Sequence, residues 1–535
     1  MKPHEPDRRP DPTRSPSAVG GRGVLGSRRR LWLPACAWVF LYYVLFLMVQ
    51  SRSYGLVNTR LLDRFPVLRT ISHSLLPDRF LLASRTGTQA DVNAVLLGGL
   101  FLALTAAWAW GLWITRRSSD GVGLGTVLPP ILAASAPLIL LPAIFSCDLG
   151  LYINYGRTLS EYGANPFVVA PLKLASDPVI AWSGCWRGYP SAYGPVWLML
   201  TGGLSGLTGE ARLPNIVAYK AALLGAHLLA TTAVWQVLRR TRPQYAAWGA
   251  VFYGWNPLVL IETVGNGHND VMLALFAALG LLAVAERRWR AAVLLVVVGA
   301  MVKVTALILL PALALAWALS LSGLRCRVGA ALATVATAAL GAAAMYAPLW
   351  AGDAWLENIR RNPAANRYYN SMWEFLARRT LRPPDEAALN RLFDDLDLVR
   401  NGLLVAAFLG LLWYQARRRA PLEDVWVWTW IAYWLSASWM WPWYFTAGIS
   451  VAAARGPSRA ALLAGALTVG GLLFWLDTPS PRTISWLGDY RSFVLFGPVL
   501  LAAVAPSLAH ATRLGLRRAV GLVDSAARRG RERAA

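Results

Sequence analysis

Residues 92–115 read VNAVLLGGLFLALTAAWAWGLWIT, and the next two residues are Arg116 and Arg117. An α-helix needs about 20 consecutive apolar residues to cross a bilayer, and this stretch is long enough. Basic residues gather on the cytoplasmic side of a membrane, so the two arginines mark the inner end of such a helix. The stretch therefore predicts a transmembrane helix that runs inward.

The rest of the chain repeats this pattern almost from end to end. Apolar residues make up 56% of the 535 residues and charged residues 15%, whereas soluble proteins carry about 25% charged residues. This composition excludes a soluble globular enzyme, a disordered protein and a receptor with a single membrane anchor. The net charge is +24, but the basic residues cluster at the ends of apolar stretches. That placement favours a membrane topology signal over a nucleic-acid surface, and we expect no nucleic-acid partner.

We expect an all-α polytopic membrane protein with about fourteen transmembrane helices, a bacterial plasma-membrane location and both termini in the cytoplasm. The expected parts are a disordered tail at 1–30, one transmembrane domain at 31–512 and a basic tail at 513–535. The short, glycine-rich stretch 193–209 is interpreted as an outer-face or re-entrant helix. A full crossing there would place Arg239 and Arg240 outside the cell. Two large loops, 147–192 and 352–397, then face the same outer side.

Asp148 opens the first outer loop, and Asp148, Tyr152 and Tyr155 recur at helical spacing, so they share one face. Arg157 follows on the same stretch, and Tyr193 lies at the end of the loop. Aromatic rings beside carboxylates suit carbohydrate, because sugar C–H faces stack on rings while hydroxyls bond to charges. The alternative is the aromatic belt that membrane proteins carry at the bilayer surface. A carboxylate at the end of a membrane helix favours the functional interpretation.

A second polar cluster, from Glu262 to Asp270, interrupts an apolar hairpin at its outer turn. His268 and Asp270 are not required by a turn, and a charge in hydrocarbon costs about 2.5–3.5 kcal/mol. The alternative is a capped helix start with Asn269 or Asp270 as N-cap. Lys303 lies at the next outer turn, where it either extends to the membrane surface or holds a phosphate. Arg360 belongs to a polar group in the second outer loop.

The four cysteines show no metal-binding spacing. Cys147 and Cys185 share the first outer loop, and we expect two free thiols there. The alternative is a disulfide, which would suit an oxidising compartment and would tether Asp148 by its neighbour. The run Asp394-Asp395-Leu396-Asp397 is interpreted as a solvated helix start, although its spacing leaves a divalent metal open. We expect no other cofactor.

Six short runs occur in an order that matches a known family. They are Asp148–Arg157, Asn165-Pro166-Phe167, Tyr193-Gly194-Pro195-Val196-Trp197, Asn256-Pro257, Gly267-His268-Asn269-Asp270 and Ala300-Met301-Val302-Lys303. This set resembles the polyprenyl-phosphate-mannose-dependent α-(1→6)-mannosyltransferases of actinobacteria, which have the GT-C glycosyltransferase fold. The resemblance covers about residues 93–475.

The resemblance implies an inverting transfer of mannose from a polyprenyl-phosphate donor in the membrane to a glycolipid acceptor at the extracytoplasmic face. Asp148 would be the general base. Arg157, Lys303 or Arg360 would supply positive charge to the leaving phosphate. His268 would contact that phosphate or the acceptor hydroxyl, and the remaining candidate substrate contacts are Tyr152, Tyr193, Asn269 and Asp270.

Three other functions remain open at this point. One is a GT-C transferase for another polyprenyl-linked sugar, such as arabinofuranose or glucose. A second is a lipid or sugar transporter, which should show broken helices in paired halves. The third is a membrane scaffold without catalysis, for which charges at the outer turns would be costly without purpose.

Overall fold

The computed structural model describes residues 20–49, 88–117, 122–141, 144–362, 368–477 and 490–504. Within these ranges the chain is helical, and the one extended pairing is an isolated bridge between Tyr369 and Trp439. The expectation of an all-α protein is confirmed there. The first helix begins at Gly20, earlier than the expected residue 31, so the part of the N-terminal tail from 20 to 30 is helical. Residues 1–19 and the expected tail 513–535 lie outside the described part.

The main helices, in chain order, are α1 (Gly20–Val49), α4 (Thr88–Arg117), α5 (Leu124–Leu140), α6 (Asp148–Ser160), α7 (Pro195–Thr208), α8 (Arg212–Thr241), α9 (Ala246–Gly254), α10 (Pro257–Leu260), α11 (Asp270–Ala285), α12 (Trp289–Ala300), α13 (Leu310–Leu319), α14 (Leu324–Tyr346), α15 (Ala354–Arg361), α16 (Met372–Phe375), α17 (Glu386–Arg418), α18 (Leu422–Ser436), α19 (Phe445–Arg455) and α20 (Arg459–Phe474). A final apolar helix covers Arg491–Val504.

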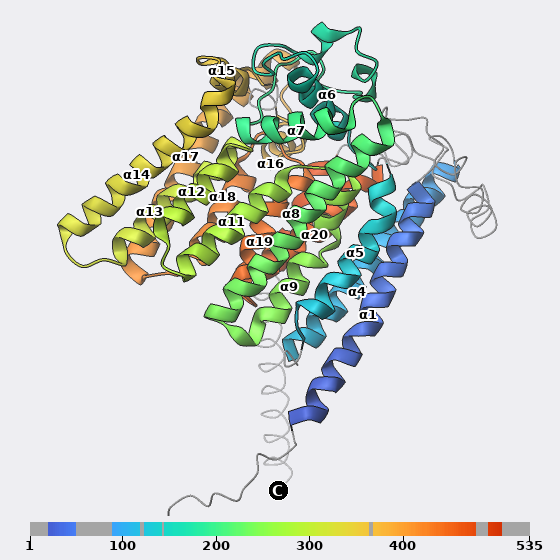
Figure 1. Ribbon diagram of the computed structural model, residues 1–535, viewed down its shortest axis with the longest axis vertical. Helices are drawn as coiled ribbons and strands as arrows, with labels where there is room; N and C mark the ends of the chain where they lie inside the picture. Colours follow the sequence, from blue (N-terminus) through green and yellow to red (C-terminus); the bar gives the residue numbers. More distant parts are fainter. Residues whose placement is uncertain are drawn as a thin grey trace, which may run out of the picture.

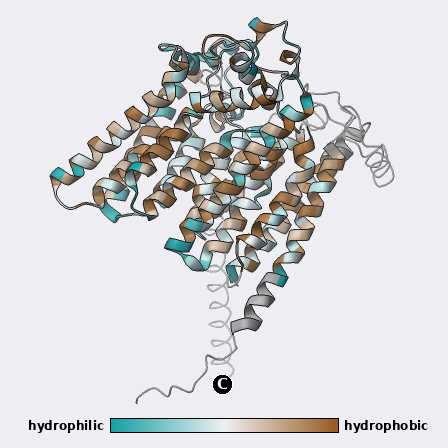
Figure 2. Ribbon diagram, in the orientation of Figure 1, coloured by the Kyte–Doolittle hydropathy of each residue, from teal (hydrophilic) through white to brown (hydrophobic). Residues whose placement is uncertain are grey.

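Five of the described helices are long and apolar enough to cross a membrane by length and composition, namely α1, α4, α8, α14 and α17. Further apolar helices of 10–17 residues run beside them. Figure 2 shows apolar residues along the bundle and hydrophilic residues gathered at its two ends. The protein is therefore a polytopic membrane protein, while the count of about fourteen crossings stays a prediction.

The bundle has a packed centre and an open flank. Helix α11 packs against α8, α12 and α19. Helices α14 and α17 lie on one flank (Figure 1), and side chains such as Leu340 and Leu398 are 72% and 79% exposed there. Apolar side chains on that scale would be unfavourable in water, so this flank suits contact with lipid.

Helices α6, α7 and α15 lie together at one end of the bundle, and α7 lies across the helix ends (Figure 1). This arrangement fits the expectation that 193–209 does not make a full crossing. The start of α7 is fixed by Gly194, because an added Cβ would lie 2.1 Å from the Met301 carbonyl oxygen. The Gly194 amide donates to Val302 O at 2.9 Å, and the Val196 amide donates to Met301 O at 3.0 Å. These bonds place Tyr193 near the segment that carries Lys303.

The expectation of two free thiols in the first outer loop is wrong. Cys147 and Cys185 form a disulfide with a Cα–Cα distance of 6.1 Å, because the loop folds back over the start of α6. Their sulfurs lie near the Asp148 carboxylate. Cysteine binds metal as a thiolate, so this group of three residues is a disulfide beside a carboxylate and not a metal site.

The interpretation of Asp394-Asp395-Leu396-Asp397 as a helix start is also wrong. Helix α17 begins at Glu386, where the Asp385 side chain accepts from the Ala388 amide as N-cap. The acidic run therefore lies inside the helix. Asp397 Oδ1 accepts bonds from Tyr368 Oη at 2.5 Å and from Arg400 Nη2 at 2.8 Å. Its carboxylate has protein partners in place of a metal ion.

Candidate active site

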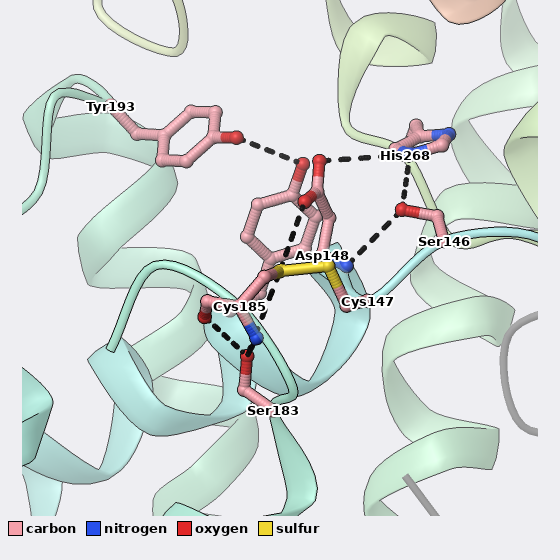
Figure 3. Close-up of a disulfide and its surroundings, with 8 residues drawn as sticks. Ser146, Cys147, Asp148, Ser183, Cys185, Tyr193 and His268 are labelled. Carbon is pink, nitrogen blue, oxygen red and sulfur yellow. Dashed lines mark hydrogen bonds and ion pairs between the residues drawn. A yellow bond between two sulfur atoms is a disulfide. The ribbon is translucent and has the colours of Figure 1, made fainter. Parts of the chain in front are cut away.

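Asp148 is the first residue of α6, and its side chain is buried beneath the first outer loop. A helix N-terminus carries a partial positive charge that favours a carboxylate at this position. Asp148 Oδ2 lies 3.6 Å from His268 Nε2 (Figure 3). The two residues come from different hairpins, so the fold joins the first and fifth of the six runs around one point.

His268 is oriented by contacts on both ring nitrogens and on one face. Its Nδ1 lies 3.0 Å from Glu262 Oε2, and its Nε2 lies 2.9 Å from Ser146 Oγ. The ring stacks on Trp443 with a centroid distance of 3.9 Å. An ionised carboxylate can only accept, so we assign the Nδ1 proton to the bond with Glu262. The Nε2 atom then faces Ser146 and Asp148 and can exchange a proton there (Figure 3).

Glu262 is a buried carboxylate that the surrounding structure holds in place. Trp475 Nε1 donates to Glu262 Oε1 at 2.7 Å, and Asn266 Nδ2 donates to Glu262 Oε2 at 2.8 Å. The residue lies in a π-helical turn, Ile261–Gly265, and such turns are frequent at functional sites. Paired in this way, the carboxylate can remain in the interior and fix the imidazole.

Two further contacts fix the segment before Asp148 relative to the segment before His268. The Phe145 amide donates to Asn266 Oδ1 at 2.7 Å. The Nζ atom of Lys220, buried on α8, donates to the carbonyl oxygens of Leu141 and Gly265, both at 2.8 Å. Interactions of this kind limit how far the base and the imidazole can separate, and a catalytic geometry needs that precision.

An ion pair lies beside this group. Lys303 Nζ donates to Asp270 Oδ1 at 2.8 Å and to Oδ2 at 3.0 Å, and it lies 4.1 Å from the centroid of the Tyr444 ring. The Lys303 side chain is 17% exposed. A partly exposed ammonium next to a buried carboxylate can interact with an anionic ligand while Asp270 holds it in position.

Two tyrosines and an amide occupy the space between Asp148 and α7. Tyr152 Oη lies 3.4 Å from both Tyr193 Oη and Asn269 Oδ1, and the two tyrosine rings meet edge to face. The Asn269 Nδ2 atom is buried without a hydrogen-bond partner within the described part of the chain. A buried donor without a partner is costly, so this amide suits a bond to a bound ligand.

Burial raises the pKa of the Asp148 carboxyl above its ordinary value. Interactions with His268 and Lys303 act in the opposite direction, while the carboxylates of Asp270 and Glu262 add to the increase. A general base works best when its pKa approaches the working pH. The surroundings of Asp148 change its pKa in that direction.

The structure does not bring two of the expected phosphate contacts into this group. Arg157 lies near the other end of α6, where its Nε donates to Asp177 Oδ2 at 2.8 Å in a buried ion pair. Nine residues of α-helix separate it from Asp148, a distance of about 13 Å along the axis. Arg360 is exposed on α15. That helix is held to the first loop by bonds from Asn358 Nδ2 to the carbonyl oxygens of Phe167 and Ser191.

Sequence reasoning missed four residues of the group: Ser146, Glu262, Trp443 and Tyr444. Glu262 lies in the second polar cluster, but the sequence assigns it no contact, and aromatic residues at a turn such as Trp443 and Tyr444 also fit an interfacial belt. Ser146 gave no signal beyond its position two residues before Asp148. The contacts of Ser146, Trp443 and Tyr444 join residues more than one hundred positions apart in the chain. Glu262, in contrast, lies six positions from His268.

Residues 65–319 match the family model described as "Alpha-(1->6)-mannopyranosyltransferase, N-terminal domain". The resemblance to this mannosyltransferase family is confirmed. Alpha-(1->6)-mannopyranosyltransferase A of Mycobacterium tuberculosis is 28% identical over 364 residues, which cover 64% of this chain and 66% of the relative. The protein of that name from Corynebacterium glutamicum is 28% identical over 233 residues, which cover 42% and 46%. Alpha-(1->6)-mannopyranosyltransferase B of Corynebacterium glutamicum is 29% identical over 206 residues, which cover 36% and 33%.

The alignments thus cover between one third and just under two thirds of the length of these mannosyltransferases. The region that matches the family model contains most of the candidate site, namely Ser146, Asp148, Glu262, His268, Asp270 and Lys303. Arg360, Trp443 and Tyr444 lie beyond it. The family resemblance therefore covers Asp148, His268 and the Asp270–Lys303 pair.

Proposed function

We propose that the protein is a membrane glycosyltransferase that moves mannose from a polyprenyl-phosphate donor to a hydroxyl group of a glycolipid acceptor, forming an α-(1→6) bond. The observation that carries this proposal is the position of Asp148. It combines a buried carboxylate, a fixed imidazole at 3.6 Å and a nearby lysine pair in the region that matches the family model. The relatives' names supply the sugar and the linkage.

In the proposed reaction the Asp148 carboxylate accepts the proton of the acceptor hydroxyl. The acceptor oxygen attacks the anomeric carbon of the donor, and a new carbon–oxygen bond forms there. The bond from that carbon to the phosphate oxygen breaks, and the lipid phosphate leaves with the electron pair. A β-linked donor would give an α-linked product by inversion.

The chain supplies groups for each of these changes in charge. Lys303 interacts with the leaving phosphate, because its ammonium is partly exposed and held by Asp270. His268 holds Asp148 and the proton it receives, since Nε2 faces that carboxylate while Glu262 fixes Nδ1. Asn269, Tyr152 and Tyr193 contact the sugar hydroxyls from the side of α7.

We place the site on the extracytoplasmic face of the plasma membrane, with both termini in the cytoplasm. The Cys147–Cys185 disulfide next to Asp148 supports an oxidising compartment. The C-terminal turns of α4, α8 and α17 carry paired arginines. These helices end at the side of the bundle away from α6 and α7 (Figure 1), which agrees with a cytoplasmic position for their basic ends.

The test is an assay of the purified protein in lipid nanodiscs with a mannosyl-lipid acceptor and a panel of donors. The panel contains polyprenyl-phosphate mannose, glucose and arabinofuranose, each labelled in the sugar. We expect labelled glycolipid from the mannose donor, with an α-(1→6) bond by linkage analysis. Product from arabinofuranose or glucose alone would refute the sugar assignment. Movement of labelled donor across the bilayer without a new glycosidic bond would favour a transporter.

A further inference from the structure

Aromatic rings form a continuous row beside the candidate active site, and only Trp443, which stacks on His268, also belongs to that site. The row consists of Tyr189, Trp186, Trp439, Tyr369, Trp441 and Trp443. Trp186 lies 5.8 Å from Tyr189 and 6.0 Å from Trp439 between ring centroids. Tyr369 lies 5.0 Å from Trp439 and 5.6 Å from Trp441. These contacts join the first outer loop, the second outer loop and the α18–α19 turn.

Backbone bonds fix the two later segments to each other. The Tyr369 amide donates to Ser438 O at 2.8 Å, and the Met440 amide donates to Tyr369 O at 3.0 Å. Trp439 lies between these two bonds. The Tyr369 and Trp439 rings therefore keep a defined spacing even though they come from different loops.

The row reaches Asp148 by two routes. At one end, Trp441 stacks on Trp443 at 4.8 Å, and Trp443 stacks on His268, which lies 3.6 Å from Asp148. At the other end, Trp186 directly follows Cys185, and the disulfide holds Cys185 to the neighbour of Asp148. A ligand on the row would consequently lie beside the proposed base.

Trp186 has a backbone conformation that a bulky residue rarely adopts, with φ at +58°. Strain of this kind persists where the surrounding structure imposes it, and it is frequent at ligand-binding sites. The Tyr189 amide donates to Trp186 O at 3.1 Å, which closes a tight turn around the strained residue. The turn brings the Trp186 ring toward Trp439.

Tyr189, Trp186 and Trp439, at the end of the row far from Trp443, have surface available for a ligand. Trp186 is tilted against Tyr189 at 60° and meets Trp439 edge to face at 67°. Neither contact stacks two rings face on face, so part of the ring faces stays uncovered. Tyr189 is 44% exposed, and Trp186 and Trp439 are half-buried. By contrast, Trp441 and Trp443 cover each other at 13°.

A polar cavity of about 280 Å³ adjoins the row at Tyr369. Its lining includes Asn370, Glu374 and Arg378. Asn370 is 3% exposed, and its Nδ2 has no hydrogen-bond partner in the part of the chain that the structure describes. Ring faces beside a cavity with amide, carboxylate and guanidinium groups match carbohydrate, which combines apolar C–H faces with many hydroxyls. A lipid tail would gain nothing from these polar groups.

We propose that this row and its cavity bind the saccharide chain of the acceptor. One hexose stacks on Trp186 and Trp439 with its hydroxyl directed to Asp148, and the following hexose extends past Tyr369 into the polar cavity. The inference rests on the proposed function where it names Asp148 as the base. The acceptor site then requires an acceptor with at least two sugar units.

Binding is tested first without any turnover, using free α-(1→6)-linked mannotetraose and the full chain in nanodiscs. The Kd is measured by saturation-transfer difference NMR titration for wild type, Trp186→Ala, Trp439→Ala and Tyr189→Ala. Trp350→Ala is the matched control, because Trp350 is an exposed ring (70%) outside the row. We expect at least a tenfold rise in Kd for Trp186→Ala and Trp439→Ala, partial recovery in Trp186→Phe and no change for Trp350→Ala.

Three results would overturn the acceptor site: no binding by wild type at millimolar mannotetraose, wild-type affinity in both tryptophan variants, or an equal loss in Trp350→Ala. Tyr189→Ala keeps the test informative if Trp186→Ala fails to fold, since Tyr189 is at the surface and should still weaken binding. In the transfer assay the variants should raise the acceptor KM and leave the donor KM unchanged. Binding without transfer from any donor would reject the proposed function alone, and transfer with unchanged acceptor KM would reject the acceptor site alone.

Discussion

The Glu262 carboxylate lies 3.0 Å from Nδ1 of His268, and the other nitrogen of that imidazole faces Asp148 at 3.6 Å. Three side chains from two hairpins are thus arranged as a carboxylate, an imidazole and a second carboxylate. Because Glu262 is fixed by Trp475 and Asn266, the imidazole cannot turn without breaking bonds in the interior. The arrangement makes Glu262 a positioning residue for the reaction at Asp148.

Glu262→Gln should lower kcat while leaving the KM values for donor and acceptor close to those of wild type. A hydrogen bond to a charged group contributes about 1.5–3 kcal/mol, which corresponds to a loss of roughly 10- to 150-fold in rate. The pH–rate profile should also shift toward lower pH, since the negative charge of Glu262 contributes to the raised pKa of Asp148. Glu286→Gln, at a partly exposed ion pair with Arg240, is the control. An unchanged rate and pH profile in Glu262→Gln would contradict this role.

The pH dependence of activity should follow the raised pKa of Asp148. The base acts in its ionised form, so turnover falls as the pH falls through a pKa that lies above the ordinary aspartate value of about 3.9. Initial rates of transfer between pH 4 and 9 measure this limb. A rate that stays constant down to pH 4 would show that no group with a raised pKa must be ionised.

The raised pKa of Asp148 also predicts how the stability of the protein depends on pH. A carboxyl whose pKa is higher in the folded state favours folding when protonated, and this contribution is lost as the pH rises through the folded-state pKa. Asparagine does not ionise, so Asp148→Asn keeps its stability as the pH rises while wild type loses this contribution. The Tm of Asp148→Asn minus that of wild type should therefore increase from pH 4 to pH 8. Differential scanning fluorimetry in detergent measures the difference in Tm. A relative stability that decreases over this range would have the wrong sign.

Gly194→Ala should destabilise the protein and reduce its activity together. The new Cβ would lie 2.1 Å from Met301 O, which forces α7 away from the segment before Lys303 and breaks the bond from the Gly194 amide to Val302. Overpacking costs typically about 1–3 kcal/mol. Gly203→Ala is the control on the same helix, because nothing lies within 4 Å of its added Cβ. Equal Tm values for the two variants would contradict the close approach.

The disulfide predicts a definite count of thiols in the denatured chain. Cys36 and Cys326 are free, so a maleimide reagent should label two thiols without reductant and four after reduction. Cys185→Ser should lower stability by about 3–4 kcal/mol in the chain-entropy model and should reduce kcat, since Asp148 loses its tether. Cys326→Ser should change neither property. Four reactive thiols before reduction would exclude the bridge.

Much of the fold could be predicted from the sequence, because a bilayer demands long apolar helices and those are visible as runs. The stretch 92–115 lies within α4, and the glycine-rich stretch 193–209 forms α7 across the bundle end. The expected loop 352–397 contains the start of α17 at Glu386, because the first turns of that helix are polar. A helix that begins outside the membrane carries no hydropathy signal at its start.

The candidate site was only partly predictable. Asp148, His268 and Asp270 could be singled out, because a charge at an apolar turn is costly and needs a reason. Their partners could not, since sequence spacing does not say which hairpins meet. Nor does the sequence show that Arg157 forms a buried ion pair with Asp177. Likewise, two cysteines in one loop are compatible with free thiols until the chain path brings them together.

If Asp148 is the base for mannosyl transfer, removing its negative charge should stop turnover, and a comparison of Asp148→Asn with wild type measures this effect. Both proteins, in nanodiscs, receive labelled polyprenyl-phosphate mannose and a mannosyl-lipid acceptor, and donor binding is measured separately by filtration. Asp353→Asn, on the surface at the start of α15, is the matched control. We predict product from wild type and Asp353→Asn, and at least a thousandfold loss of turnover in Asp148→Asn with donor binding retained. Turnover by Asp148→Asn at a rate close to that of wild type would show that Asp148 is not the base.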